Sequence, residues 1–263
     1  MTNFLGAAAP LTRQGFDEAL RLLHVDAPSL WALMTVETRG FGFLPDRRPK
    51  ILFERHIFHK RTGGRFSALH ADISSSVAGG YIGGGAEYQR VARAMALDHD
   101  AALESASWGL GQIMGFNAPK LGYGTAEDMI GNFLQGEDQQ LQGTLRFISA
   151  NPALARAFAG KQWPKVAFFY NGASYAKNEY DKKLDRYFTL YTVKGTPSID
   201  IRTAQAWLTY LGYSPRGVDG VIGDGTRTAI IAFQKEKGLP VTADLNDQTA
   251  IELERAAAGT PLH

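Results

Sequence analysis

The segment Asp26–Phe43, DAPSLWALMTVETRGFGF, places a carboxylate where a predicted helix ends and a glycine-containing loop begins. The first residue, an aspartate, can cap the helix, and the proline lies in the first turn, where its missing N–H costs little. Leu30, Met34 and Glu37 are spaced i, i+4 and i+7, so Glu37 shares a helix face with apolar side chains. The pattern predicts an acid that is directed toward the core.

Burial of a carboxyl group disfavours its charged form and raises its pKa. A buried Glu37 would therefore stay protonated near neutral pH and could donate a proton to a leaving oxygen. The alternative is a structural carboxylate at a helix end, balanced by Arg39 or by backbone N–H groups. Glu37 alone does not decide between a general acid and a structural group.

The composition excludes several classes of protein. The chain has 263 residues, of which 44% are hydrophobic and 21% charged, as in a folded protein with one large domain or two smaller ones. It contains no cysteine, which excludes disulfides and thiol chemistry. A net charge of +2 is too small for a nucleic-acid-binding protein. The N-terminus does not have the pattern of a signal peptide, and no stretch approaches the ~20 apolar residues of a membrane span. We expect no nucleic-acid partner and no stable membrane insertion.

The order of predicted elements indicates a mainly α protein. Between about residues 13 and 190, helices are joined by glycine-rich loops, with one short strand-like run in PKILFERHIF (49–58). The segment 86–105 is predicted to be one helix. Further helices are expected around 125–149, 152–159, 163–170 and 177–190. This part is predicted to be a helical domain with a small β element.

A break in the helical pattern follows at Gly195 and Pro197, after which Ser198 can cap a new helix. The next 60 or so residues contain three short helical segments and a turn-rich stretch. We therefore expect a first domain at 1–193 and a small three-helix bundle at 197–257.

Two further motifs combine glycines with polar side chains. SASWGLGQIMG (105–115) has glycines on both sides of Gln112, so the backbone can approach a ligand while Gln112 and Ser107 offer hydrogen bonds. AFFYNGASY (167–175) places Tyr170 and Asn171 at the end of an apolar helix. An aromatic hydroxyl beside an amide suits a sugar, although packing alone would also explain either motif.

Taken together and in this order, the motifs resemble the goose-type lysozyme and lytic transglycosylase superfamily. The matching residues are Glu37-Thr38, the S-x-G-L-x-Q-I run at 107–113 and the Y-N-G run at 170–172. The segment 42–67, GFLPDRRPKILFERHIFHKRTGGRFS, is similar to the N-acetylmuramidase domain of modular phage endolysins. The chain departs from the transglycosylase pattern at Gly111, where Met is frequent, and at Phe169, where Ala is usual.

The resemblance implies a lysozyme-like catalytic domain. Glu37 would be the general acid that protonates the glycosidic oxygen between N-acetylmuramic acid and N-acetylglucosamine. The remaining motif residues would line the substrate cleft: Ser107, Gln112, Tyr170 and Asn171.

A hydrolase that inverts the sugar needs a second carboxylate to activate water. Glu54 is our candidate, because it follows the strand-like run that flanks the cleft in lysozyme-like folds. An ion pair of Glu54 with Arg55 or Arg48 is the alternative. Weaker candidates lie on loops, at Asp46 and Asp72.

The segment 199–254 resembles the peptidoglycan-binding domain of cell-wall hydrolases, with a D-G-x-x-G turn at 219–223 and T-x-x-A-I-x-x-F-Q at 226–234. The turn is not a calcium loop, because alternating acidic ligands are missing and Ile230 stands where a bidentate Glu belongs. His56 and His59 do not form a zinc motif. We expect no metal and no cofactor, and bacterial peptidoglycan as the partner.

These features predict a peptidoglycan-degrading endolysin, a monomeric glycoside hydrolase with a wall-binding module. Such a protein would be made in the host bacterial cytoplasm and reach the wall after membrane permeabilisation. One alternative is a lytic transglycosylase, which forms 1,6-anhydro ends. The other is a non-enzymatic, wall-binding phage structural component.

Overall fold

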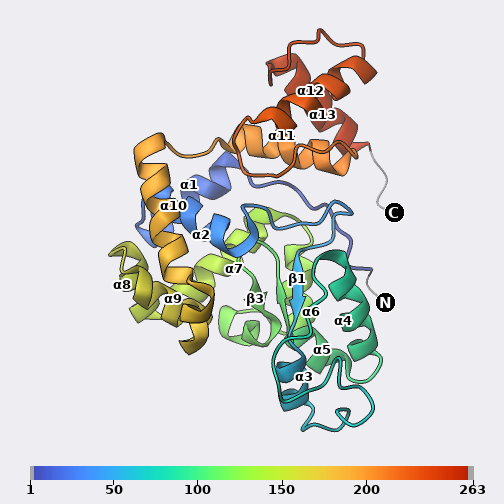
Figure 1. Ribbon diagram of the computed structural model, residues 1–263, viewed down its shortest axis with the longest axis vertical. Coiled ribbons are helices and arrows are strands. Elements are labelled where there is room, and N and C mark those ends of the chain that lie inside the picture. Colours follow the sequence, from blue (N-terminus) through green and yellow to red (C-terminus); the bar gives the residue numbers. More distant parts are fainter. Residues whose placement is uncertain (1–2, 260–263) are drawn as a thin grey trace.

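The computed structural model describes residues 3–259, except for the side chains of residues 174 and 177; residues 1–2 of the predicted first domain lie outside this range. The fold is mainly helical with a small central sheet, and a C-terminal bundle lies at one end of the molecule (Figure 1). The predicted fold class is therefore confirmed.

The α-helices before the C-terminal bundle pack around the sheet. They are α1 Arg13–Leu23, α2 Ala27–Thr38, α3 Arg55–Arg61, α4 Glu87–Met95, α5 His99–Glu104, α6 Ala126–Phe133, α7 Glu137–Ser149, α8 Pro152–Ala159, α9 Trp163–Asn171 and α10 Tyr180–Lys194. Short 3-10 helices occupy Gly84–Ala86, Gly115–Asn117, Pro119–Leu121 and Ala173–Asn178. The bundle consists of α11 Ile199–Tyr210, α12 Asp224–Glu236 and α13 Asp247–Ala258.

Side-chain caps explain where several helices begin. The predicted caps at Asp26 and Ser198 are both confirmed, because each side chain accepts a hydrogen bond from the backbone N–H three residues later. The single helix predicted over 86–105 is wrong. Asp98 leaves the helical conformation and accepts a hydrogen bond from the N–H of Ala101, so it starts α5 as a separate helix.

The sheet joins segments that are distant in the sequence. Its order is β1 (Ile51–Phe53), β2 (Ala106–Trp108) and β3 (Ile113–Met114), all antiparallel. Sequence analysis predicted the run that contains β1 and missed β2 and β3, which are too short to show an alternating pattern. The pairing places the end of β1 beside the start of the 105–115 motif.

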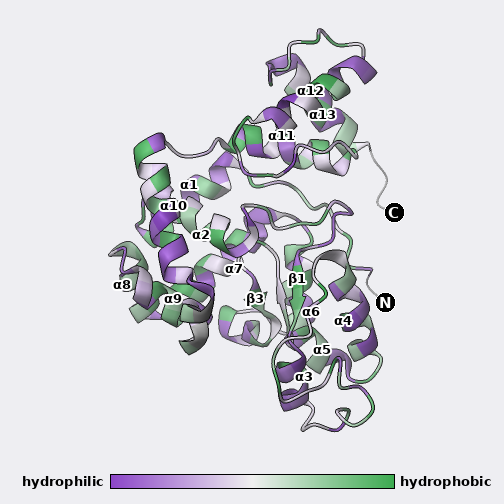
Figure 2. Cartoon of the chain, viewed as in Figure 1, coloured by the Kyte–Doolittle hydropathy of each residue, from purple (hydrophilic) through white to green (hydrophobic). Residues whose placement is uncertain are grey.

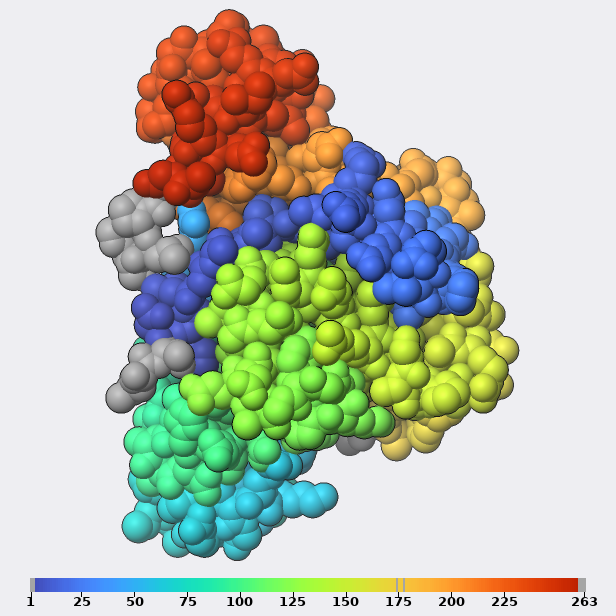
Figure 3. Space-filling view, turned by 180° about the vertical axis from the view of Figure 1, so that it is seen from behind, coloured from blue at the N-terminus to red at the C-terminus, as the bar shows by residue number. Residues whose placement is uncertain are grey.

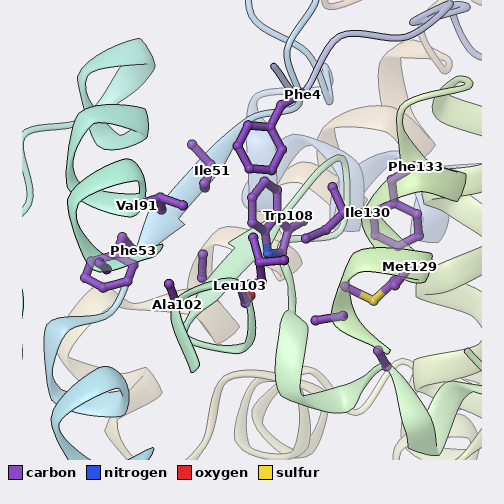
Figure 4. Packing of buried hydrophobic residues seen from close by; sticks show 14 of the residues in the cluster. Phe4, Ile51, Phe53, Val91, Ala102, Leu103, Trp108, Met129, Ile130 and Phe133 are labelled. Carbon is purple, nitrogen blue, oxygen red and sulfur yellow. The ribbon is translucent and has the colours of Figure 1, made fainter. Parts of the chain in front are cut away.

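Two hydrophobic clusters form the core, and they meet at the cavity that Glu37 and Glu54 line. One surrounds Trp108, which packs against Phe4 from the N-terminal segment (Figure 4). The other is built from buried hydrophobic residues of α1, α2 and α7 to α10, helices in which hydrophobic positions are green in Figure 2. Phe147 and Tyr170 are partly buried and pack against both clusters. They therefore lie at the junction of the two halves.

The C-terminal bundle packs closely against the rest of the protein. Phe41 and Phe43 from the loop after α2 share a buried cluster with Tyr210 of α11. The N-terminal segment passes beneath the bundle (Figure 3), and Tyr210 donates a hydrogen bond of 2.9 Å to the carbonyl of Ala8. The bundle is thus joined to the larger part by a packed interface as well as by the chain.

Candidate active site

One cavity brings together all six side chains that sequence analysis proposed for the site. Its volume is about 490 Å³, and it lies where α2, the sheet and α9 meet. The six are Glu37, Glu54, Ser107, Gln112, Tyr170 and Asn171, and the remaining lining residues are Leu52, Ile113, Met114, Phe116, Asn117, Phe147 and Tyr180.

Glu37 lies in the last turn of α2, at the bottom of this cavity. Burial raises the pKa of Glu37 to about 8, while a hydrogen bond from the Asn171 side chain opposes the shift by favouring the charged form. Arg39 is exposed, and within residues 3–259 no ion pair forms on Glu37. Arg39 therefore does not balance Glu37, which removes one form of the structural alternative. Near pH 7 the carboxyl is mostly protonated and can donate a proton.

Glu54, the second carboxyl group of the cavity, is held by a hydrogen bond from the loop that precedes α4. It directly follows β1, and Tyr81 donates its hydroxyl proton to the carboxylate, 2.9 Å from Oε2 and 3.1 Å from Oε1. His56 Nδ1 is buried and lies 3.2 Å from Glu54 Oε2, but it is not aligned for a hydrogen bond. The Glu54 carboxylate thus accepts a hydrogen bond from a hydroxyl group, and within residues 3–259 no cation donates a hydrogen bond to it.

The expected ion pair of Glu54 with Arg55 or Arg48 is wrong. Arg55 donates to the carbonyl of Val77, and Arg48 pairs with Asp46. The two weaker acid candidates are also engaged elsewhere: Asp46 by Arg48, and Asp72 by Arg93, which lowers the pKa of Asp72. Neither Asp46 nor Asp72 lines the cavity.

Ser107 and Gln112 form a bonded pair on the β2–β3 hairpin. The Ser107 hydroxyl donates to Gln112 Oε1 at 2.9 Å, and Gln112 Nε2 donates to the carbonyl of Gly109 at 2.9 Å and to that of Lys50 at 3.3 Å. Because these bonds occupy the amide, Gln112 fixes the shape of the hairpin wall in addition to lining the cavity.

Tyr170 holds the turn of the same hairpin. Its hydroxyl donates to the carbonyl of Gly111 at 2.8 Å, and its ring packs edge-on against Phe147. A Cβ on residue 111 would collide with the Thr144 hydroxyl and lie 3.0 Å from the Tyr170 oxygen. Glycine at position 111 therefore leaves room for the contacts of the hairpin with Thr144 of α7 and Tyr170 of α9.

Sequence analysis missed a glycine-rich loop that supports Glu54. The run GGYIGGG (79–85) was given no role there, whereas in the structure Tyr81 of this loop donates a hydrogen bond to Glu54. Glu87 is fully buried and accepts hydrogen bonds from the N–H groups of Ile82 and Gly83, and it pairs with Arg90 at 2.8 Å. The signal available in the sequence was Glu87, an acidic residue at the start of a predicted helix that follows a run of glycines.

A second missed feature is the support of the loop that follows Glu37. Glu137 at the start of α7 accepts a hydrogen bond of 2.7 Å from Gly42 N–H, and Arg202 of α11 donates one of 2.6 Å to the carbonyl of Gly40. Arg202 and Glu137 are paired through two bonds of 2.7 and 2.6 Å, and both side chains are completely buried. The C-terminal bundle therefore helps to hold the loop that follows α2, through the hydrogen bond from Arg202 to Gly40.

Within the part of the chain that the structure describes, no group of three His, Cys, Asp or Glu side chains is arranged to hold a metal ion. The chemistry that this site offers is that of its carboxyl groups. A carboxyl group with a raised pKa and a second carboxyl group in the same cavity are the kind of pair that glycoside hydrolysis uses.

The helical fold, the small sheet and the acid at the end of α2 define a lysozyme-like glycoside hydrolase. Comparison with protein families agrees, because the N-acetylmuramidase model matches residues 26–192 and a putative peptidoglycan binding domain matches residues 198–253. The chain belongs to the N-acetylmuramidase family and carries a C-terminal peptidoglycan-binding domain.

Among solved structures, the chain is similar to the crystal structure of a Burkholderia AP3 phage endolysin. The two share 39% sequence identity with a TM-score of 0.64, over 71% of this chain and 72% of that chain. No curated protein matches the chain.

Proposed function

We propose that this protein is a phage endolysin in which Glu37 and Glu54 hydrolyse the bond between N-acetylmuramic acid and N-acetylglucosamine. The observation that carries the proposal is the contrast between the two carboxyl groups of one cavity: burial raises the pKa of Glu37 to about 8, whereas Glu54 accepts a hydroxyl hydrogen bond. The similarity to a Burkholderia phage endolysin supports a phage origin.

In the proposed reaction Glu37 transfers its proton to the glycosidic oxygen as the bond to C1 of the muramoyl sugar breaks. Positive charge develops on that sugar ring. Glu54 removes a proton from a water molecule, and the water oxygen forms the new bond to C1. Asn171 then stabilises the ionised Glu37 until a proton returns from solvent, since its hydrogen bond favours the charged form.

Product analysis tests this proposal against a lytic transglycosylase. Digestion of purified peptidoglycan should give reducing N-acetylmuramic acid ends, because water completes the reaction. A transglycosylase uses the muramoyl 6-hydroxyl and gives 1,6-anhydro ends, which mass spectrometry distinguishes by the mass of one water. Glu54→Gln should suppress the reducing products by about 10²–10⁴ in rate. Mainly anhydro products would overturn the hydrolytic role of Glu54.

A wall-binding phage structural component without activity was the other alternative. The family match and the carboxyl pair in the cavity favour an enzyme. The corresponding test adds the purified protein to cells with exposed peptidoglycan and measures turbidity. An enzyme lowers the turbidity, and a structural component does not.

The cellular setting forms part of the same proposal. Between residues 3 and 259, no helix combines the length and the apolar character required to cross a bilayer. We place synthesis in the host cytoplasm and action at the wall after membrane permeabilisation, by a monomer that binds peptidoglycan and no nucleic acid. Size-exclusion chromatography with light scattering tests the monomeric state.

A further inference from the structure

The active-site cavity continues on the other side of Glu37. A second cavity shares Glu37, Leu52 and Gln112 with the first, and it extends toward Arg39 and Lys50. A third cavity, of about 510 Å³, shares Arg39, Leu44 and Lys50 with the second. Because neighbouring cavities share wall residues, the three lie next to one another in a row that leads away from the carboxyl pair.

The third cavity lies between the catalytic part and the C-terminal bundle, and we call it the interdomain groove. Its walls come from the segment 39–50 on one side and from the segment 209–218 on the other. Apolar groups such as Phe43 and Val218 form part of its lining, together with Tyr213 and Pro215. The surface is therefore suited to a chain that has both apolar and polar groups.

The charged residues that line this groove are all basic. Its charged lining residues are Arg39, Lys50 and Arg216, and none of the described residues that line it is Asp or Glu. Arg39 and Arg216 are exposed and, among the described side chains, form no ion pair. Lys50 is mostly enclosed and donates a hydrogen bond of 2.7 Å to the carbonyl of Thr38. Two cations are thus available to an anionic ligand.

The two walls of the groove are held in a fixed relation. The buried pair of Arg202 and Glu137 joins α11 to α7, and Arg47 donates a hydrogen bond of 2.7 Å to the carbonyl of Ala257 in α13. A site formed in advance requires less ordering when a ligand binds. The groove is therefore part of the folded protein and does not depend on closure of the bundle.

The charge of peptidoglycan is not evenly distributed. In a strand with peptide stems, the carboxyl group of each muramoyl unit is consumed in an amide bond, so the glycan chain itself is neutral. The free carboxylates belong to the stems. A positively charged groove that opens from a glycan cleft therefore complements the stem and not the sugar backbone.

We propose that the interdomain groove binds the carboxylate-bearing peptide stem of the strand whose glycan lies in the catalytic cleft. The proposal rests on the proposed function, because it places the same strand beside Glu37. Arg39 and Arg216 contact the stem carboxylates from opposite walls. The protein then distinguishes strands with stems from strands without them.

Binding of short glycans to the full chain tests this proposal. The ligands are tetrasaccharides of the wall that retain their peptide stems and the same tetrasaccharides after removal of the stems by an amidase. Calorimetry in the non-cleaving Glu37→Gln background should show tighter binding of the stem-bearing ligand, with a difference that decreases as salt is added. Arg39→Gln together with Arg216→Gln should lower the affinity for the stem-bearing ligand by about 2- to 10-fold and leave the affinity for the stripped ligand unchanged.

A matched control removes the same charge elsewhere. Arg21 and Lys235 are exposed and lie outside the groove, so Arg21→Gln with Lys235→Gln should leave both affinities unchanged. Because Arg39 adjoins the end of α2, the single variant Arg216→Gln, on the bundle side, provides a second test. Equal affinities of parent and groove variants for the stem-bearing ligand would overturn the proposal, as would an equal loss for both ligands.

Cleavage is measured separately with active protein. If neither tetrasaccharide is cleaved while the difference in binding is present, the proposed hydrolysis fails and the groove assignment stands. If both are cleaved while the groove variants bind like the parent, the hydrolysis stands and the groove assignment fails.

Discussion

Glu37 and Glu137 are both enclosed glutamates, and their surroundings differ in every important respect. Glu137 accepts two hydrogen bonds from the guanidinium of Arg202 and two from backbone N–H groups, those of Leu11 and Gly42. Glu37 has a hydrogen bond from the neutral side chain of Asn171, and burial raises its pKa to about 8. One carboxyl group is paired with a buried cation, whereas burial without a cation raises the pKa of the other.

This difference separates a structural acid from a reactive one. A paired, fully hydrogen-bonded carboxylate is costly to disturb, because loss of its partner leaves an uncompensated charge in the interior. An enclosed carboxyl group without a cation holds its proton until a reacting group takes it. Burial alone therefore does not identify a catalytic acid, and the partner of the carboxyl group has to be known.

The largest effect should come from removing the proton of Glu37. Glu37→Gln keeps the shape of the side chain but cannot donate to the leaving oxygen, so we expect lysis to fall by about 10²–10⁴ or more. Turbidity of cells with exposed peptidoglycan measures the rate. Glu127→Gln, at an exposed position in α6, is the control and should retain full activity. Lysis at the parent rate by folded Glu37→Gln would end its assignment as the general acid.

The next effect concerns the paired acid. Arg202→Met leaves Glu137 buried without its cation, and we expect a loss of about 3–5 kcal/mol in the free energy of unfolding. Urea denaturation measures it. The double variant with Glu137→Leu as well removes the unpaired charge and should recover much of the loss. If the single variant were as stable as the parent, the pair would not hold the bundle in place.

A smaller effect, of opposite sign, is expected for the stability of Glu37→Gln. The folded protein keeps a proton on Glu37 that the unfolded chain releases between pH 4.5 and about 8, so the free energy of unfolding falls as pH rises through this window. Glutamine has no such proton. The variant should match the parent near pH 4 and exceed it by up to about 4 kcal/mol at pH 8. Parallel pH profiles of the two proteins would contradict this expectation.

The smallest effect concerns the wall of the cleft. Tyr170→Phe removes the hydrogen bond to the carbonyl of Gly111 and should cost about 0.5–1.5 kcal/mol of stability, with a modest loss of activity. Thermal unfolding measures the change. Tyr187→Phe is the control, because the hydroxyl of Tyr187 forms no hydrogen bond within residues 3–259. Similar losses in both variants would show that the Gly111 contact contributes nothing specific.

Local patterns in the sequence predicted much of the fold. Asp26 as a cap and the apolar spacing before Glu37 predicted α2 and the position of its acid, and both depend on neighbours within one helix. The three ordered motifs predicted which side chains would meet in one cavity. The division into a first domain at 1–193 and a bundle at 197–257 is a prediction from the break in the helical pattern at Gly195 and Pro197.

Contacts between distant segments were beyond the reach of such patterns. Arg202 and Glu137 are 65 residues apart, and each looks like an ordinary charged position on an amphipathic helix. Tyr81 reaches Glu54 from a loop whose path depends on the buried Glu87. The β2–β3 hairpin exists because its strands pair with β1, since two or three residues have no strand preference strong enough to be recognised.

Direct titration of Glu37 tests the central claim. The carboxyl carbon of Glu37 can be followed by NMR between pH 4 and 10 in protein labelled at glutamate, with Glu37→Gln used to assign the resonance. We predict a midpoint near 8, because burial without a cation disfavours the charged form. A midpoint near 4.5 would show that Glu37 is ionised at neutral pH and would contradict its role as the proton donor.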